Sequence, residues 1–159
     1  MQVIGVKTSV STSSDEILED IEEYRRKKEV FIQIFDSDKV IGKEHLQWAY
    51  QKAKECFENG TNRADSLEIE TLLWASAEWQ IKDALDKMGV KDHDEEAVVL
   101  IEDEVSLENL LDFMGWTRDD DLLKLDKKKL KDFGIQEEEI EAVDDPYELV
   151  FEKMATSIL

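Results

Sequence analysis

Two short acidic stretches hold the residues whose types and spacing come nearest to a reactive site. The first, "DSDKVIGKEHL", places Asp36 and Asp38 upstream of His45. Carboxylates beside a histidine can support general-base hydrolysis, so a small hydrolase using His45 with Asp36 or Asp38 is one hypothesis. A calcium loop is excluded, because a third oxygen ligand near Val40, a glycine at position 41 and a distal acid are all missing. Because His45 lies at the start of a predicted helix, we favour a surface or capping role for it.

The second stretch, "KDHDEE", offers His93 between Asp92 and Asp94. The same string is typical of a solvated turn before a strand, and we assign no metal to it. The single cysteine, Cys56, lies beside an apolar stripe and has acidic rather than basic neighbours, which indicates an unreactive side chain. The sequence also lacks a phosphate-binding glycine loop, a GxSxG elbow and an HExxH motif. We therefore predict no enzyme activity and no cofactor.

The composition restricts the possible partners. Forty acidic and twenty basic residues among 159 give a net charge of -20. This charge repels phosphate over long distances, so any contact with nucleic acid has to be local. The 42% apolar content supports one folded domain. The lone cysteine, an amino terminus unlike a signal peptide and the lack of a long uncharged apolar run lead us to expect a cytoplasmic protein that crosses no membrane.

Apolar periodicity predicts alternating strands and helices up to residue 115. Strands are expected over 2–10, 29–35 and 96–103; helices are expected between Ser13 and 25–28, then over 42–60, 66–89 and 106–115. Ser13 and Glu16 suggest a capping box at the first helix. Because both faces of 29–35 are apolar, we expect this strand at the centre of a sheet that is covered on both sides.

The helical run "SLEIETLLWASAEWQIKDAL" is interrupted by small and polar residues. Ser76 can cap a new helix, which predicts two helices that meet at a bend. Unpaired N–H groups at a new helix start can bind a phosphate or carboxylate, and Trp79 in the polar break can stack on a base. A simple packed kink explains the same pattern, and both interpretations remain open.

After Trp116 the sequence becomes more charged, and its sparse apolar positions predict two short helices with a turn at Gly134. Asp145 as a cap and Pro146 at the first helical position predict a terminal helix. Its apolar stripe is expected to remain partly exposed for a partner, or else to seal the core of the domain itself. The predicted fold is a mixed α/β (α+β) single domain over 1–159, with a small mixed or antiparallel sheet flanked by helices and a helical carboxyl-terminal part over 116–159.

Several blocks, in order, resemble the small kinase-binding subunit of the KEOPS (also EKC) complex, the TPRKB-like family of archaea and eukaryotes. They are "IQIFDSDKVIGKEHLQWAYQKAKECFENG", "SLEIETLLWASAEWQIKDALDKMGV", "AVVLI" and "FGIQEEEIEAV". That family commonly has A-S-G-x-R-Q-I at the bend. Here Ala75, Ser76, Gln80 and Ile81 match, whereas Ala77 replaces the glycine and Trp79 replaces the arginine.

The resemblance implies a non-catalytic adaptor that docks on the small atypical kinase/ATPase subunit of KEOPS and contacts the remaining subunits indirectly. It also implies recruitment of tRNA by its 3′ CCA end, for threonylcarbamoyladenosine modification next to the anticodon. The expected kinase-binding residues are Leu67, Leu149, Val150, Met154 and Ile158. The expected tRNA-binding residues are Lys43, Lys52, Arg63, Trp79, Gln80 and Lys82.

Two alternatives remain beside this interpretation. A protein-only adaptor would bind the kinase without touching RNA, which the acidity and the missing arginine favour. The hydrolase hypothesis predicts a concave pocket that joins His45 to Asp36 or Asp38.

Overall fold

The computed structural model describes residues 1–8 and 12–157, and within these ranges it contains one four-stranded antiparallel sheet. The strands, in the spatial order β2-β3-β1-β4, are β1 Gln2–Lys7, β2 Ile32–Asp36, β3 Glu96–Ile101 and β4 Thr117–Arg118. The helices are α1 Ser14–Lys28, α2 Lys43–Asn59, α3 Leu67–Ser76, α4 Ile81–Met88, α5 Leu107–Met114, α6 Lys127–Asp132, α7 Glu137–Glu141 and α8 Pro146–Thr156. Short 3-10 turns occupy Ser37–Lys39 and Asp120–Leu123.

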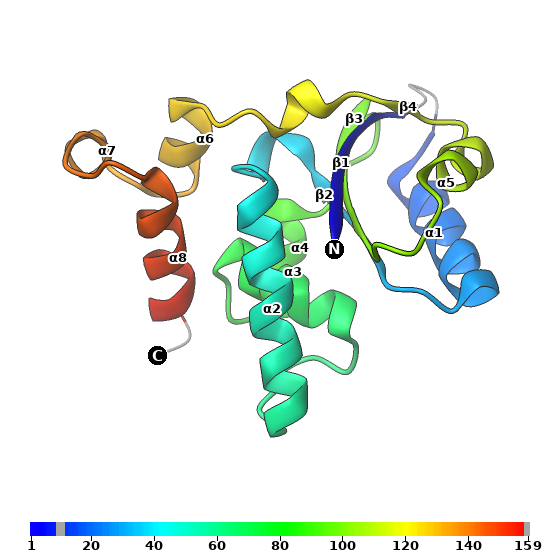
Figure 1. Cartoon of the computed structure of the whole chain (residues 1–159), viewed down its shortest axis with the longest axis horizontal. Helices are drawn as coiled ribbons and strands as arrows, with labels where there is room; N and C mark the ends of the chain where they lie inside the picture. Colours follow the sequence, from blue (N-terminus) through cyan, green and yellow to red (C-terminus); the bar gives the residue numbers. More distant parts are fainter. Residues whose placement is uncertain (9–11, 158–159) are drawn as a thin grey trace.

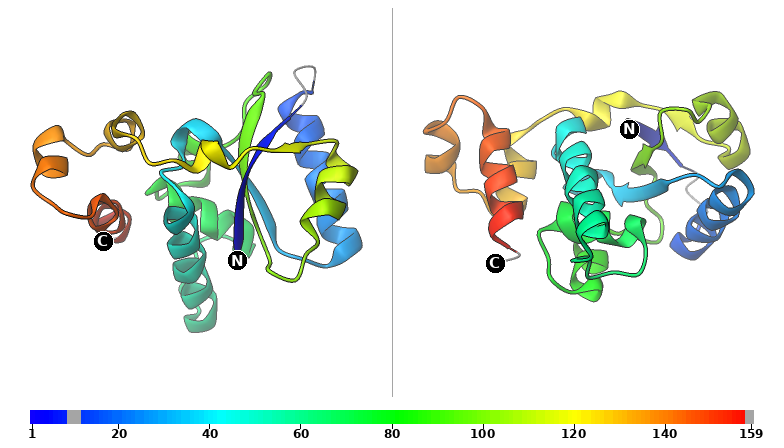
Figure 2. Two further views of the ribbon diagram at one scale, coloured as in Figure 1. Left: turned by 45° about the horizontal axis from the view of Figure 1, so that its top comes forward. Right: turned by 60° about the horizontal axis from the view of Figure 1, so that its bottom comes forward.

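Helices cover both faces of the sheet (Figure 1). On one face, α1 and α5 pack over a core that includes Ile4, Ile21 and Val99. On the other face, α2, α3, α4 and α8 enclose a larger core that includes Phe35, Leu72 and Val98. The two further views separate these layers, with the carboxyl-terminal helices lying beyond α2 (Figure 2). The mixed α/β prediction is confirmed, and the sheet is antiparallel.

The position predicted for β2 is wrong. β2 lies at an edge of the sheet and pairs only with β3, whereas β3 and β1 are the central strands. Residues 32–35 are nevertheless buried, with Ile32 and Ile34 in one core and Phe35 in the other. A strand that is apolar on both faces therefore indicates that both faces are covered. It does not show that the strand is central, because helices can also cover both faces of an edge strand.

The ends of several helices follow the local signals. Ser13 accepts a hydrogen bond from the Glu16 N–H at 3.2 Å, and Gly60 caps the end of α2 with a left-handed φ of 68°. Asp145 caps α8 with Pro146 in its first turn, as predicted. The first strand is shorter than expected: it ends at Lys7, and residues 9 and 10 of the predicted span lie outside the described residues.

Candidate nucleic-acid and partner interfaces

The helical run 66–85 does break in two, but Ser76 does not begin the second helix. Ser76 is the last residue of α3, and its buried hydroxyl donates to Leu73 O at 3.1 Å and accepts from Glu78 N–H at 3.3 Å. Gln80 occupies the cap position of α4 and makes no side-chain capping bond. The correction follows from Ala77, whose φ of 57° ends α3 in a left-handed turn. A left-handed φ suits glycine, which is the residue that the A-S-G-x-R-Q-I motif has at the position of Ala77.

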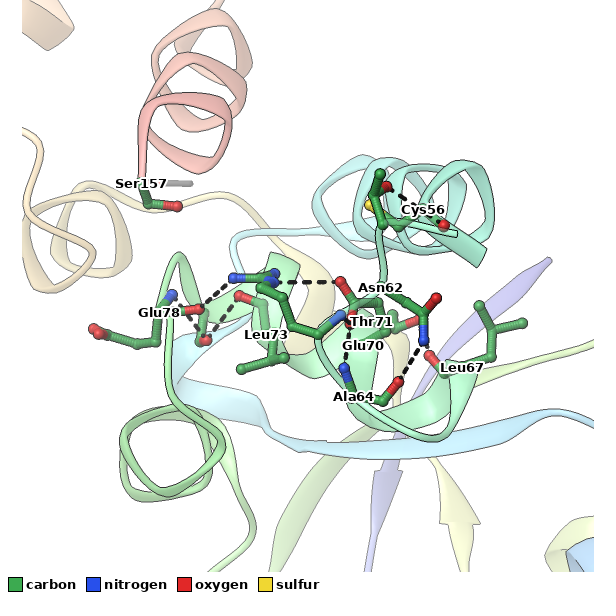
Figure 3. Close-up of polar contacts among 12 residues, drawn as sticks. Cys56, Asn62, Ala64, Leu67, Glu70, Thr71, Leu73, Glu78 and Ser157 are labelled. Carbon is green, nitrogen blue, oxygen red and sulfur yellow. Dashed lines mark hydrogen bonds and ion pairs between the residues drawn. The ribbon is translucent and has the colours of Figure 1, made fainter. Parts of the chain in front are cut away.

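A buried carboxylate organises the loop before α3. Glu70 accepts hydrogen bonds from the backbone N–H groups of Arg63 at 2.7 Å and Ala64 at 2.8 Å (Figure 3). The Arg63 Nε also lies 3.4 Å from a Glu70 oxygen, and the Glu70 side chain is fully buried. A buried charge needs such compensation, so Arg63 is first of all the structural partner of Glu70.

The guanidinium of Arg63 extends from this loop to the α3–α4 break. Its Nη1 donates to Glu78 O at 3.2 Å, and its centre lies 5.7 Å from the Trp74 ring and 5.2 Å from the Trp79 ring. These separations permit cation–π attraction to both indoles. Arg63 Nη2 and Trp74 Nε1 are buried and have no hydrogen-bond partner among the described residues. The break thus combines a held positive charge with Trp79, whose side chain is 56% exposed.

The structure brings together four of the six predicted tRNA-binding residues. Arg63 reaches Trp79, and the exposed Gln80 and Lys82 follow at the start of α4. The other two lie on α2. Lys43 is exposed at its first residue, and Lys52 is held 2.9 Å from Glu55 and 5.4 Å from the Trp48 ring.

Lys87 is a residue at this break that the sequence analysis missed. Its ammonium donates to Ser76 O at 2.6 Å and lies 3.4 Å from a Glu78 oxygen. Burial lowers the pKa of Lys87, while the nearby Glu78 carboxylate opposes this shift. The helical spacing of Lys87 gives no signal of this contact, because the partner carbonyl lies on the preceding helix.

The surface role expected for His45 is wrong. The side chain is fully buried, and its Nδ1 accepts from the Ile41 N–H at 3.1 Å. Its Nε2 therefore carries the ring proton and donates to Ala75 O at 2.8 Å. The surface hollow beside Asp36 and Asp38 contains His93 instead. The predicted pocket joining His45 to these carboxylates is contradicted.

Among residues 1–8 and 12–157, no group of three or more histidine, cysteine or acidic side chains is arranged to hold a metal ion. Burial raises the pKa of Asp36, the hydrogen bond from the Asp38 N–H opposes this shift, and the Asp94 carboxylate adds to it. No helix in the described ranges is both long and apolar enough to span a bilayer.

The terminal-helix stripe mostly seals the protein's own core. Val150 and Met154 are fully buried, so the expectation that they form an exposed kinase contact is wrong. Phe151 stacks on Trp48 with ring centroids 5.1 Å apart, which fixes α8 against α2. Leu67 and Leu149 are only partly buried and remain available for the predicted contact. Ile158 lies outside the described residues.

Comparison with known proteins places these observations in a family. A family model described as "Kinase binding protein CGI-121" matches residues 8–157, which is nearly the whole chain. A search of curated proteins found no significant match. The matched range contains the α3–α4 break, the Arg63–Glu70 loop and α8. The chain therefore belongs to the kinase binding protein CGI-121 family.

Proposed function

We propose that this protein is a non-catalytic subunit of the KEOPS complex, which binds the small kinase/ATPase subunit directly and helps to recruit tRNA by its 3′ CCA end. The kinase partnership is supported by membership of a kinase-binding family. Contact with the remaining subunits is indirect. The tRNA is the substrate for threonylcarbamoyladenosine formation next to the anticodon, and this protein supplies binding surface rather than catalytic groups.

One observation supports the RNA contact above all: Trp79 is 56% exposed while the Arg63 guanidinium lies 5.2 Å from its ring. A single-stranded end is bound by stacking of its bases on aromatic faces and by local positive charge along its phosphates. The Arg63 guanidinium provides that charge beside the indole, and the exposed Lys82 follows three residues after Trp79 in the chain. Trp79 thus takes the place of the family arginine by stacking.

A protein-only adaptor is the second candidate. The net charge of -20 and the engagement of Arg63 by Glu70 favour it, since both reduce the attraction for phosphate. The two candidates differ in whether the 3′ end of tRNA affects binding.

The decisive experiment compares intact tRNA with tRNA lacking its CCA end. We expect the intact tRNA to bind, with affinity that falls steeply as salt rises, and the trimmed tRNA to bind much more weakly. Trp79→Ala should cost about 1 to 3 kcal/mol of binding free energy, the worth of one stacked base. Phe113→Ala is the matched control, because Phe113 is another exposed aromatic residue, at 41%, and lies on α5 rather than in the α3–α4 break. Equal binding of intact and trimmed tRNA would favour the protein-only adaptor.

A further inference from the structure

The two oxygens of the Glu70 carboxylate bind different groups. Glu70 is in the first turn of α3 and is fully buried, so it cannot touch an RNA itself. Its Oε2 accepts the N–H groups of Arg63 at 2.7 Å and Ala64 at 2.8 Å, whereas its Oε1 lies 3.4 Å from Arg63 Nε. One oxygen therefore fixes the backbone of the loop, and the other orients the guanidinium.

The guanidinium of Arg63 is in turn bound to the segment that carries Trp79. Its Nη1 donates to the carbonyl of Glu78, the residue before Trp79, at 3.2 Å (Figure 3). Its centre lies over the Trp79 ring at 5.2 Å and over the buried Trp74 ring at 5.7 Å. A single side chain thus connects the buried carboxylate of Glu70 to the exposed indole.

Glu78 is held through all of its polar groups. Its N–H donates to Ser76 Oγ at 3.3 Å, and its carbonyl accepts from Arg63. Its carboxylate lies 3.4 Å from Lys87 Nζ, which reaches it from α4. A residue bonded at its N–H, its carbonyl and its side chain has little freedom to change its backbone conformation. The backbone that leads into Trp79 is therefore fixed.

Trp79 combines this fixed backbone with a side chain that is 56% exposed. A large side chain at a surface normally moves among several rotamers and loses this freedom when it binds a partner. An indole already held against a guanidinium loses less, because part of the ordering takes place when the protein folds. The arrangement is that of a stacking surface prepared before the RNA arrives.

We infer that Glu70 is a positioning residue for the RNA contact: through Arg63 it holds the Trp79 indole in the orientation on which a base of the tRNA 3′ end stacks. The inference rests on the proposed tRNA recruitment and deepens it. A carboxylate that only compensated the charge of Arg63 would reduce the attraction for phosphate. The two roles of Glu70 therefore predict opposite effects on RNA binding when its charge is removed.

Glu70→Gln separates these roles. The amide oxygen can keep both backbone N–H bonds, while the NH2 group faces Arg63 Nε and cannot accept from it. We expect the full-length variant to bind intact tRNA about three- to tenfold more weakly, although it carries one negative charge fewer. Binding of tRNA that lacks its CCA end should change by less than about twofold, because the stacked bases are missing.

Glu102→Gln is the matched control. The Glu102 carboxylate also accepts a backbone N–H, that of Phe31 at 2.7 Å, but it lies just after β3 rather than at the α3–α4 break. Its variant has the same net charge as Glu70→Gln. We expect it to keep the preference of the unmodified chain for intact over trimmed tRNA.

A second variant tests whether Glu70 acts through the indole. Adding Glu70→Gln to Trp79→Ala should change the affinity for intact tRNA by less than about twofold, because the side chain that Glu70 positions is already absent. A general loss of structure would instead weaken binding in both backgrounds, and that result would overturn the inference.

Thermal unfolding checks that each variant is folded. Arg63→Lys replaces Glu70→Gln if the latter unfolds: it keeps the net charge but lacks the planar fork that spans Glu70 and Glu78, so binding of intact tRNA should weaken similarly. Unchanged or stronger binding of intact tRNA by the variant would overturn the inference and leave the proposed function standing. Equal binding of intact and trimmed tRNA by the unmodified chain would overturn both.

Discussion

The imidazole of His45 joins the start of α2 to the end of α3. It accepts the Ile41 N–H before α2 and donates to Ala75 O near the end of α3. Phe133 packs edge-on against the ring, with centroids 5.3 Å apart. Full burial lowers the pKa of His45 to about 4, because a charged ring would lose its hydration. The neutral form is therefore part of the folded state.

This pKa predicts a loss of stability in mild acid. Between about pH 6.5 and 4, His45 is protonated in the unfolded chain but stays neutral in the folded protein. The contribution of neutral His45 to the free energy of unfolding is therefore complete above about pH 6.5 and declines as the pH falls. At pH 4.5 it should be about 2 to 3 kcal/mol smaller than at pH 8. Urea unfolding at the two pH values measures the difference.

Carboxylates also titrate in this range, so variants isolate the histidine. His45→Asn retains an acceptor for the Ile41 N–H, but it has no titrating ring. Its free energy of unfolding should therefore decline less steeply with falling pH than that of the unmodified protein. His93→Gln alters an exposed histidine and should leave the decline unchanged. An identical pH dependence for His45→Asn and the unmodified protein would contradict the assignment.

At the scale of elements, α8 acts as a cover for the α2–α3 layer. Val150 and Met154 lie in the core, and Phe151 stacks between Trp48 and Tyr147. Leu149 lies on the partly exposed side of the helix. The neighbouring residues Leu149 and Val150 therefore have different roles: Val150 stabilises the core, and Leu149 contributes to the surface.

Replacing Met154 by Glu should strongly destabilise the fold, because it buries a charge without a partner. We expect the free energy of unfolding to fall by about 3 kcal/mol or more. Leu149→Glu should change it by less than about 1 kcal/mol, since this side chain can reach water. Chemical denaturation of the two variants provides the comparison. Equal stability of both would show that α8 does not seal the core.

For the molecule as a whole, the excess of acidic residues opposes the compact state. Helices surround the sheet on both faces, so the charged side chains are concentrated on their outer surfaces. A net charge of -20 on such a small body causes self-repulsion that counterions can screen.

Adding sodium chloride should therefore raise the thermal midpoint. From about 0.02 to 0.5 M, we expect an increase of a few degrees as the screening length falls below about 10 Å. Chloride is preferable to sulfate, because exclusion of sulfate from the surface stabilises proteins by a different route. A midpoint that falls with salt would mean that local ion pairs outweigh the net repulsion.

Local signals predicted the elements well, and long-range packing decided the rest. Asp145 and Pro146 marked the start of α8, and Gly60 marked the end of α2, because caps depend on adjacent residues. The burial of His45 depends on Phe133 and Ala75, which no pattern near position 45 reveals.

The surfaces show the same limit. The apolar stripe of α8 was visible in the sequence, but only its packing against α2 shows which side faces the core. Leu18 and Leu85 belong to separate helices, and only the splayed layers bring them to one groove. The RNA contact of Trp79 remains a prediction.

The two cores that share β3 also affect how the strands find their alignment. Its side chains alternate between the cores, with Val98 and Leu100 on one side and Val99 and Ile101 on the other. A slip by one residue would exchange one apolar set for another, so hydrophobicity alone discriminates poorly against misalignment. The Glu102 side chain just after the strand provides a residue-specific contact, because its carboxylate accepts the Phe31 N–H at 2.7 Å and a shifted strand would lose this bond. The alignment of this strand thus relies on a side-chain hydrogen bond at its end more than on the apolar residues at its centre.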